Sequence, residues 1–493
     1  MFTRIWNFIR GVISKLIPFK SIEAVERIET PISTEMAQKL DDWYDEYRGK
    51  AGWLGEPYMR SLNLPAFISA EVARQITLEM EWNISGTEKD EAGGNITNPR
   101  ADYLREEFEK CIKQLRLKLE QGCAAGGMTI KPYPKEDGHI YFDFTMDWSL
   151  YPIAFDGSGH LSDVIFRDTY IEGKVFYTRL ERHKVEGDRI RVTHRAFKST
   201  SRDMVGTEIP LKEVPIWADL EPEAWLEDTD GLMFGWYKVA IANNIDTESP
   251  MGVSIFSRAE KLIHDADEQY SRLLWEYEGS ELAIDVDPSV LRPKKVPGAN
   301  GKSEGMEMPR LNERLFRGVD MGQDDTYHVF SPQIRDGSLL SGLGQILCRI
   351  EDQCGLSRGT LVDAPADART ATELKILKQR TYTTITGNQE SLEACLRDVV
   401  RAMDKYATIY KLAPEGSYEV SFEWDDSIIT DTNQQMLERI QMVNLGAMST
   451  AELREWYLGE TPTQATAAIQ KIKAEQMEQA MAMAAMQNEV TEP

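Results

Sequence analysis

A helical pattern of unusual length, from Thr370 to about Leu412, is the feature of this sequence that most constrains its fold. The first four residues read Thr-Ala-Thr-Glu, in which the hydroxyl and the carboxylate can satisfy each other's backbone N–H groups, so they predict where the helix begins. At ~1.5 Å per residue this helix would be roughly 60 Å long, several times the usual length in a globular protein. Gly387 lies in its middle, where glycine is about 1 kcal/mol less favourable than alanine, and predicts a kink.

A helix of this length is not expected to bury both of its faces inside one subunit. Part of its apolar stripe should therefore pack on neighbouring copies of the chain. The candidates for that subunit interface are Leu392, Leu396, Val399 and Met403. For each of them, a core within the chain itself is an equally open interpretation.

The region before residue 250 changes from helical to strand periodicity, which predicts an α+β body. Apolar residues at helical spacing predict helices over 66–82 and 103–119, the second of them ending at Gly122. The sequence Asp137-Gly138 is typical of a hairpin turn between two strands. The predicted strands cover 129–133, 139–144, 164–166, 175–180 and 190–197.

Two helices that enclose a small insert are predicted next. Their apolar stripes cover 255–277 and 339–354, and a glycine follows each. The residues between them, 284–335, are rich in proline, glycine and charge, which indicates a separate small module. A loop over 357–369 then leads to the long helix. A strand over 418–424 and helices that begin at Ser449 and Thr461 complete the chain.

The composition disfavours several classes of protein. The 493 residues carry a formal net charge of −25, so a generally basic nucleic-acid-binding protein is disfavoured, and two to four domains are expected. No uncharged apolar run approaches the ~20 residues of a membrane span. The five cysteines form no Cys-x-x-Cys pair, which indicates reduced thiols. The first 20 residues predict an amphipathic helix that docks on protein, because Arg4, Arg10 and Lys15 interrupt the apolar run that a signal peptide needs.

No convincing catalytic, cofactor-binding or metal-binding constellation is present in the sequence. Residues 298–303 end like a phosphate-binding loop, but Val296 stands where that motif needs its first glycine. Two acidic groups are more typical of helix caps and solvated turns than of a two-metal site. They are Asp324 with Asp325, and Asp425 with Asp426 and Asp431. An enzyme is therefore the minority hypothesis, and no cofactor or metal is predicted.

The order of these parts is specific, although no single motif is. An α+β body, a helix, a small insert, a returning helix, a loop, a very long helix, a strand and C-terminal helices follow one another. This order resembles that of the portal proteins of tailed bacteriophages, in the branch common in long-tailed phages, and the resemblance covers nearly the whole chain. It is best at Arg60-Ser-Leu-Asn-Leu64, Asp267-Glu-Gln-Tyr-Ser271, Gly355-Leu-Ser-Arg-Gly359, Thr370-Ala-Thr-Glu373, Trp424-Asp-Asp-Ser-Ile428 and Leu445-Gly-Ala-Met-Ser449.

The resemblance implies an α+β, predominantly helical fold of the portal type. Its parts would be the wing (1–250), the first stem helix (251–282), the clip (283–336), the second stem helix (337–356), the tunnel loop (357–369), the long kinked wing helix (370–415), and a strand with the crown helices (416–493).

The resemblance also implies a function. Portal proteins form rings, usually of twelve subunits, at the capsid vertex of the virion, after assembly in the host cytoplasm. Double-stranded DNA enters and leaves through the ring. The expected partners are copies of the chain, the terminase, head–tail connector proteins, and capsid and scaffolding proteins, with no membrane. The alternatives are an ATPase or nuclease component of the packaging motor, or a minor capsid protein without DNA contact.

Basic residues near the tunnel loop are the expected contacts with DNA in this acidic chain. They are Arg358, Arg369, Lys375 and Lys378. A twelve-membered ring would carry roughly −300 formal charges, which would repel DNA and favour sliding, because each phosphate contact adds affinity through counterion release. An equally open interpretation is that the negative charge only keeps the surface soluble. The alternative is an ordinary surface loop whose arginines pair with Asp363 and Asp367.

Overall fold

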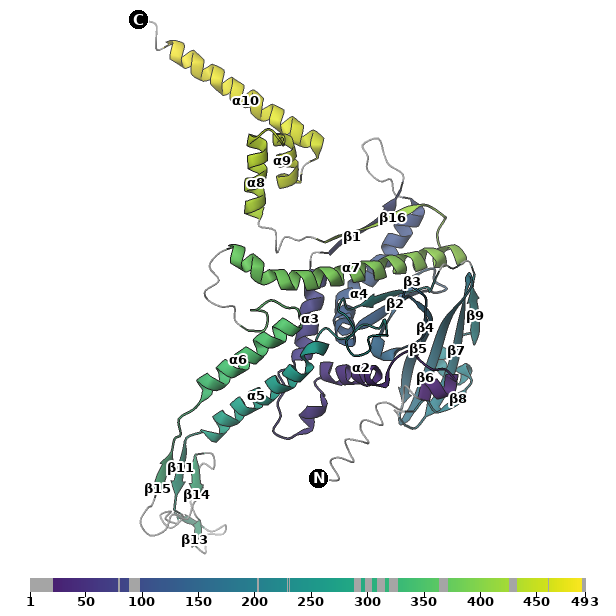
Figure 1. The fold of residues 1–493 in the computed structure, drawn as a ribbon, viewed down its shortest axis with the longest axis vertical. Helices are drawn as coiled ribbons and strands as arrows, with labels where there is room; N and C mark the ends of the chain where they lie inside the picture. Colours follow the sequence, from purple (N-terminus) through teal and green to yellow (C-terminus); the bar gives the residue numbers. More distant parts are fainter. Residues whose placement is uncertain are drawn as a thin grey trace. The chain divides into compact units, whose positions relative to one another are not determined.

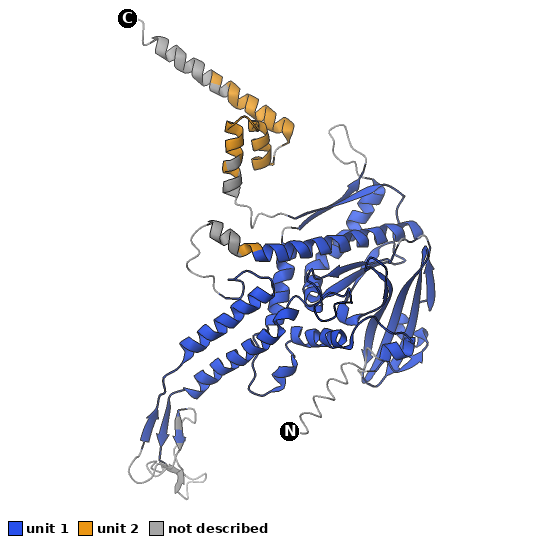
Figure 2. Ribbon diagram, in the orientation of Figure 1, with its two compact units in different colours: residues 1–368, 380–424 blue, residues 369–379, 425–493 orange. Residues whose placement is uncertain are grey.

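The computed structural model describes residues 21–78, 80–87, 98–201, 204–227, 229, 231–287, 294–297, 304–307, 315–318, 327–362, 371–424, 432–459 and 461–489. The chain forms two compact units, coloured separately in Figure 2. Unit 1 comprises residues 1–368 and 380–424, and unit 2 comprises residues 369–379 and 425–493. Helices and sheets are mixed, which confirms the α+β prediction. The predicted N-terminal amphipathic helix lies outside the described residues.

Three helices make up much of the core of unit 1. They are α2 (Thr34–Tyr47), α3 (Leu64–Thr77) and α4 (Pro99–Ala125). Trp43 and Phe108 are fully buried among them. The helix α4 ends at Gly126, whose φ of 91° suits glycine, and not at Gly122 as predicted. Gly122 stays inside the helix because a Cβ there would lie 3.1 Å from Met128, so the small residue permits close packing.

A two-stranded sheet joins the beginning and the end of unit 1. The strand β1 (Met80–Gly86) pairs antiparallel with β16 (Tyr418–Trp424) along its whole length. The prediction of a single helix over 66–82 was therefore wrong, because the helix ends at Thr77 and the chain turns into β1. The strand β16 covers the predicted residues 418–424.

Two larger antiparallel sheets complete the body. The first has the order β10-β2-β3, and the second the order β4-β5-β6-β7-β8, with β9 also paired to β7. The predicted hairpin at Asp137-Gly138 joins β2 to β3. The strands are β2 (Gly127–Pro134), β3 (Ile140–Met146), β4 (Leu150–Phe155), β5 (Leu161–Glu172), β6 (Val175–Glu186), β7 (Arg189–Ser199), β8 (Thr207–Ile209), β9 (Glu223–Leu226) and β10 (Gly235–Lys238). Single turns of 3-10 helix lie at Gly52–Gly55 (η1), Asp147–Ser149 (η2), Leu211–Glu213 (η3), Pro215–Trp217 (η4) and Ser257–Ala259 (η5).

A pair of helices carries the predicted insert. Helices α5 (Glu260–Gly279) and α6 (Asp336–Gln353) pack side by side, and short strands lie at their ends (Figure 1). The sheet orders there are β14-β11-β15 and β12-β13. The strands are β11 (Ala283–Val286), β12 (Lys294–Pro297), β13 (Glu304–Glu307), β14 (Phe316–Gly318) and β15 (Tyr327–Phe330). Residues 298–303 and Asp324 with Asp325 lie outside the described residues.

The predicted long helix is α7, Ala371–Ile409, with 39 residues. It crosses the body in Figure 1 and contributes to the core of unit 1. Its side chains Leu392, Leu396, Val399 and Met403 are completely buried within their own chain. That packing fits the core within the chain, which the sequence left open beside a contact with a neighbouring subunit. Their apolar stripe exists as predicted, but the body of the same chain covers it.

Hydrogen bonds also hold α7 to the β10 segment. The amide oxygen of Asn388 accepts hydrogen bonds from the Tyr237 hydroxyl at 2.7 Å and from the Ala240 backbone N–H at 3.1 Å. The Ser391 hydroxyl donates to the Lys238 carbonyl at 2.6 Å. Because Asn388 is fully buried, these bonds satisfy a polar group that would otherwise destabilise the core.

Unit 2 contains three C-terminal helices, α8 (Thr432–Asn444), α9 (Thr450–Leu458) and α10 (Pro462–Glu489). The predicted capping box at Ser449 is confirmed, since Ser449 and Glu452 bond to each other's backbone N–H groups. Thr461 and Gln464 exchange similar bonds at the start of α10. Helix α8 was not predicted from the sequence. In the part of the chain that the structure describes, no helix combines the length and apolarity needed to cross a lipid bilayer.

Candidate functional site at the base of the loop between α6 and α7

Glu351, near the end of α6, binds the first half of the loop that leads to α7. Glu351 is fully buried. Its Oε1 accepts backbone hydrogen bonds from Gly359 at 3.2 Å, Leu361 at 2.6 Å and Val362 at 3.4 Å. A buried carboxylate must be compensated in this way, because desolvation disfavours its charge. The loop backbone over 359–362 is thus wrapped around one oxygen of Glu351.

Threonines of α7 hold the same loop from the other side. The Ser357 backbone N–H donates to the Thr381 hydroxyl at 2.7 Å, and the Thr381 hydroxyl donates to that of Ser357 at 2.8 Å. The Thr384 hydroxyl donates to the Gly355 carbonyl at 2.9 Å. Gly355 has a φ of 67°, which favours glycine, and a Cβ there would collide with the Thr384 hydroxyl. Both the backbone conformation and the lack of space therefore require glycine at this position. Residues 355–362 therefore have a defined shape.

Asp352 forms ion pairs with three arginines beside this loop. Arg358 of the loop lies 3.2 Å from its carboxylate, Arg349 of α6 lies 3.8 Å from it, and Arg380 of α7 forms a third ion pair. Burial raises the pKa of Asp352, but hydrogen bonds from Arg380 and Arg358 outweigh that effect and bring the pKa below its usual value. Asp352 is therefore ionised at neutral pH, and the three guanidinium groups share one carboxylate.

Two of the four predicted DNA contacts, Arg358 and Lys378, have side chains that the structure describes. Arg358 belongs to the cluster around Asp352, whereas Asp363 and Asp367, its alternative partners, lie outside the described residues. Lys378 is an exposed residue of α7. Arg369 lies outside the described residues, and the side chain of Lys375 is not described.

Sequence reasoning missed Arg349 and Arg380. The spacing of Arg349 and Asp352, three residues apart on a helix, was a usable signal for the first. Arg380 had no such signal, because it reaches Asp352 only through the packing of α7 beside the end of α6.

A surface groove lies where residues 57–60 run along α5. The backbone of this segment is attached to α5, since the Arg60 N–H donates to Ser271 and the Leu62 N–H donates to the buried Asp267, both at 2.8 Å. Tyr58 and Trp275 line the groove and are 65% and 67% exposed. Two large aromatic side chains so exposed within one groove are typical of a surface that meets another protein.

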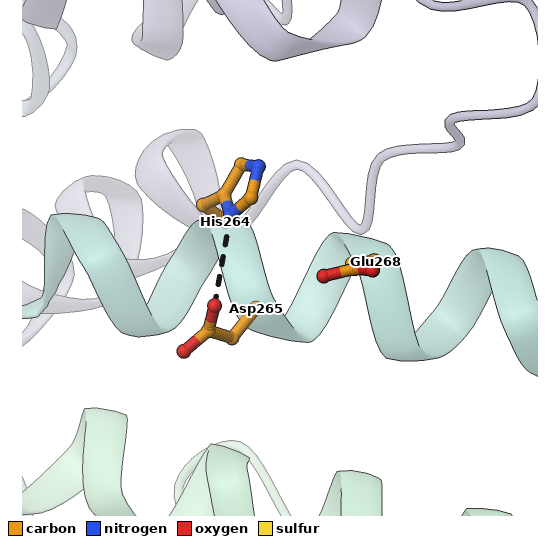
Figure 3. Close-up of side chains that lie close together, drawn as sticks. All are labelled: His264, Asp265 and Glu268. Carbon is orange, nitrogen blue, oxygen red and sulfur yellow. Dashed lines mark ion pairs between the residues drawn. The ribbon is translucent and has the colours of Figure 1, made fainter.

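One group of side chains in the described part of the chain could hold a metal ion by geometry alone. His264, Asp265 and Glu268 each offer a ligand atom, and these atoms lie within 4.8 Å of one another (Figure 3). All three residues lie within two turns of α5, only Asp265 among them is exposed, and Glu268 already pairs with Arg272 at 2.5 Å. This arrangement is typical of a solvated helix surface, and we assign no function to it. The acidic residues Asp425, Asp426 and Asp431 lie outside the described residues.

Comparison with known families identifies the chain. The model of a family described as phage portal protein, SPP1 Gp6-like, matches residues 74–481, which is most of the chain. No curated protein matches the sequence. The matched range includes α5, α6, the loop base, α7 and the greater part of α10.

Proposed function

Because the chain belongs to the phage portal protein family, we propose that it forms a ring at the capsid vertex of the virion and that double-stranded DNA passes through this ring during packaging and ejection. The family match over residues 74–481 is the observation that carries the proposal. Proteins of this family are generally structural and not enzymes. The proposed partners are eleven further copies of the chain, the terminase, head–tail connector proteins, and capsid and scaffolding proteins.

The parts of the fold have proposed roles within such a ring. The body of unit 1 would be the wing, α5 and α6 the stem, and the strands β11 to β15 the clip that meets the terminase and the connectors. The loop over 357–369 would be the tunnel loop, and α8 to α10 the crown. The support for the tunnel loop is its firmly attached base, because a loop that acts on DNA needs a rigid scaffold behind it.

The groove on α5 is the proposed contact between neighbouring subunits. The groove replaces the earlier interface candidates, because the side chains of those residues are covered by their own chain. They are Leu392, Leu396, Val399 and Met403. Trp275 and Tyr58 supply large rigid apolar surfaces, and aromatic side chains of this kind dominate protein interfaces. Ring closure makes this contact heterologous, so a different face of the next subunit would cover the two side chains.

Electron microscopy of the purified full-length protein tests the proposal. Rings with a central hole are expected, and a preparation of monomers only would contradict it. Trp275→Asp should shift sedimentation from rings to folded monomers, whereas Trp275→Tyr, which keeps an aromatic side chain, should retain rings. Rings that are unchanged in Trp275→Asp would remove the α5 groove from the interface.

The alternative of a packaging-motor enzyme makes a different prediction. The purified chain should not hydrolyse ATP or cleave DNA in the presence of Mg²⁺. Clear turnover of either substrate would favour the motor component and contradict the portal assignment.

A further inference from the structure

The three arginines around Asp352 come from three separate segments of the chain. Arg349 belongs to α6, Arg358 to the loop, and Arg380 to α7, yet their guanidinium groups meet at one carboxylate. An isolated surface ion pair needs only two side chains, so this convergence leaves more positive than negative charge at one point. The formal net charge of the whole chain is −25, which makes a local excess of this sign unusual here.

The three arginine side chains are much more exposed to solvent than the Asp352 side chain. The side chains of Arg349, Arg358 and Arg380 are 68%, 50% and 52% exposed, whereas that of Asp352 is 19% exposed. The carboxylate thus lies behind the guanidinium groups, which remain open to solvent. The neighbouring Glu351 offsets their charge only in part, because three guanidinium groups still face two carboxylates, and its Oε1 accepts backbone N–H groups of the loop.

A guanidinium group binds a phosphate group through two N–H donors, and a half-exposed arginine keeps donors free for it. Three such groups without a carboxylate would hold a DNA backbone firmly, since each phosphate contact releases counterions and adds affinity. Asp352 changes this balance. A phosphate that approaches the cluster must compete with a carboxylate that is already in contact with all three arginines.

On the basis of the proposed function, we propose that Arg349, Arg358 and Arg380 form a binding surface for the phosphate backbone of double-stranded DNA, and that Asp352 is a built-in competitor that keeps this binding weak. Each contact with a passing phosphate would then be exchanged for the contact with Asp352 when the DNA moves on. The surface would guide DNA without anchoring it. The lowered pKa of Asp352 supports this role, because the competitor stays charged at neutral pH.

The test uses rings of the full-length protein and a blunt linear DNA duplex of fixed length, with the dissociation constant measured at several salt concentrations. Asp352→Asn removes the competing charge and nearly keeps the shape. It should tighten binding by roughly tenfold at 0.1 M salt, and the salt dependence should become steeper by about one counterion per freed contact. Asp352→Glu keeps the charge and should bind DNA as the wild type does.

Two further variants make the test specific. Asp398→Asn removes a carboxylate of α7 that pairs with Arg401 at 3.4 Å, away from the cluster, and should not change DNA affinity. Replacing all three arginines of the cluster with Ala should weaken DNA binding and should abolish the gain caused by Asp352→Asn. If Asp352→Asn binds DNA no more tightly than the wild type, or if it still gains affinity without the three arginines, the inference is wrong.

The outcome also separates this inference from the proposed function. Rings that form normally but show no effect of Asp352→Asn on DNA affinity would overturn the inference alone. Wild-type protein that forms no rings would overturn the proposed function, and the inference with it.

Discussion

Gly387 of α7 lies directly against Ala240, and a Cβ built on the glycine would be 3.3 Å from the Cβ of Ala240. The residue at the middle of the long helix is therefore small because the chain after β10 crosses there. The sequence pattern suggested a kink at this glycine, and the structure offers close packing as the physical reason for its presence.

The first prediction follows from this contact. Gly387→Val adds a branched side chain where the Cβ alone already lies 3.3 Å from Ala240, so it should lower the free energy of unfolding by ~1–3 kcal/mol in urea denaturation. Gly344 in α6 is the control, because nothing lies within 4 Å of a Cβ at that position. Gly344→Ala should raise the free energy of unfolding by up to ~1 kcal/mol. Equal stability of Gly387→Val and wild type would contradict the close approach at Ala240.

The second prediction concerns Arg100, which is 1% exposed. Its guanidinium donates to the carbonyls of Pro414 at 2.9 Å and Asp404 at 3.3 Å, and to the Thr408 hydroxyl at 3.0 Å, so it closes the C-terminal end of α7. Arg100→Met removes these hydrogen bonds together with the ion pair to Asp404 at 3.6 Å, and should destabilise the body by ~3 kcal/mol in thermal or urea denaturation.

Arg105 provides the matched control for Arg100 on the same helix. Its pair with Asp102 at 2.6 Å is largely exposed, and Arg105→Ala should change stability by less than ~1 kcal/mol. If the two variants were equally stable, the network at the end of α7 would make no net contribution.

The third prediction is a pH dependence at Asp147. This side chain is completely buried, its Oδ1 accepts from the Trp236 indole at 3.2 Å, and its Oδ2 has no hydrogen-bond partner. Burial raises the pKa of Asp147 to about 7, although the Trp236 hydrogen bond and the charge of Lys238 act in the opposite direction.

A raised carboxyl pKa stabilises the fold at low pH and not at high pH. The stabilising protonation is complete below the unfolded pKa of ~4 and is lost as the pH rises towards about 7. Asp147→Asn removes the titration. Its denaturation midpoint should match that of the wild type near pH 4 and exceed it at pH 8. A constant difference between the two proteins over this range would contradict the assignment.

The fourth prediction concerns the independence of unit 1. Nearly all buried apolar side chains belong to it, and beyond Trp424 only Ala465 is a buried apolar residue among those that the structure describes. A chain that ends at Trp424 should therefore keep the main thermal transition of the full-length protein in calorimetry. Loss of that transition would show that unit 2 is part of the same folding unit.

The sequence predicted those helices and strands whose signal lies within their own residues. The α7 helix, the β16 strand and the β2–β3 hairpin each contain their own signal, in capping residues, alternation or turn residues. It failed at β1, since Ile76, Met80 and Ile84 are four residues apart and continue the helical spacing of α3. Only the pairing with β16, which lies far away in the sequence, makes this segment a strand.

At the candidate site, too, the sequence could not predict which distant residues come into contact. An apolar stripe with Leu392 and Leu396 predicts that a helix face is covered, but it contains no information on whether the cover is the same chain or another. Likewise, Arg358 was identifiable as a basic residue near a loop, whereas its grouping with Arg380 depends on how α6 and α7 meet. Tertiary packing decides both cases.

The pairing of β1 with β16 has a consequence for synthesis on the ribosome. Residue Met80 emerges early, but its partner Trp424 is translated only after the whole of α5, α6 and α7. Until then the edge of β1 has no strand to bond with, and the core beneath it, including Ile84, cannot close. A chain that ends before residue 418 lacks β16, so it cannot complete this sheet or cover Ile84 as the full chain does.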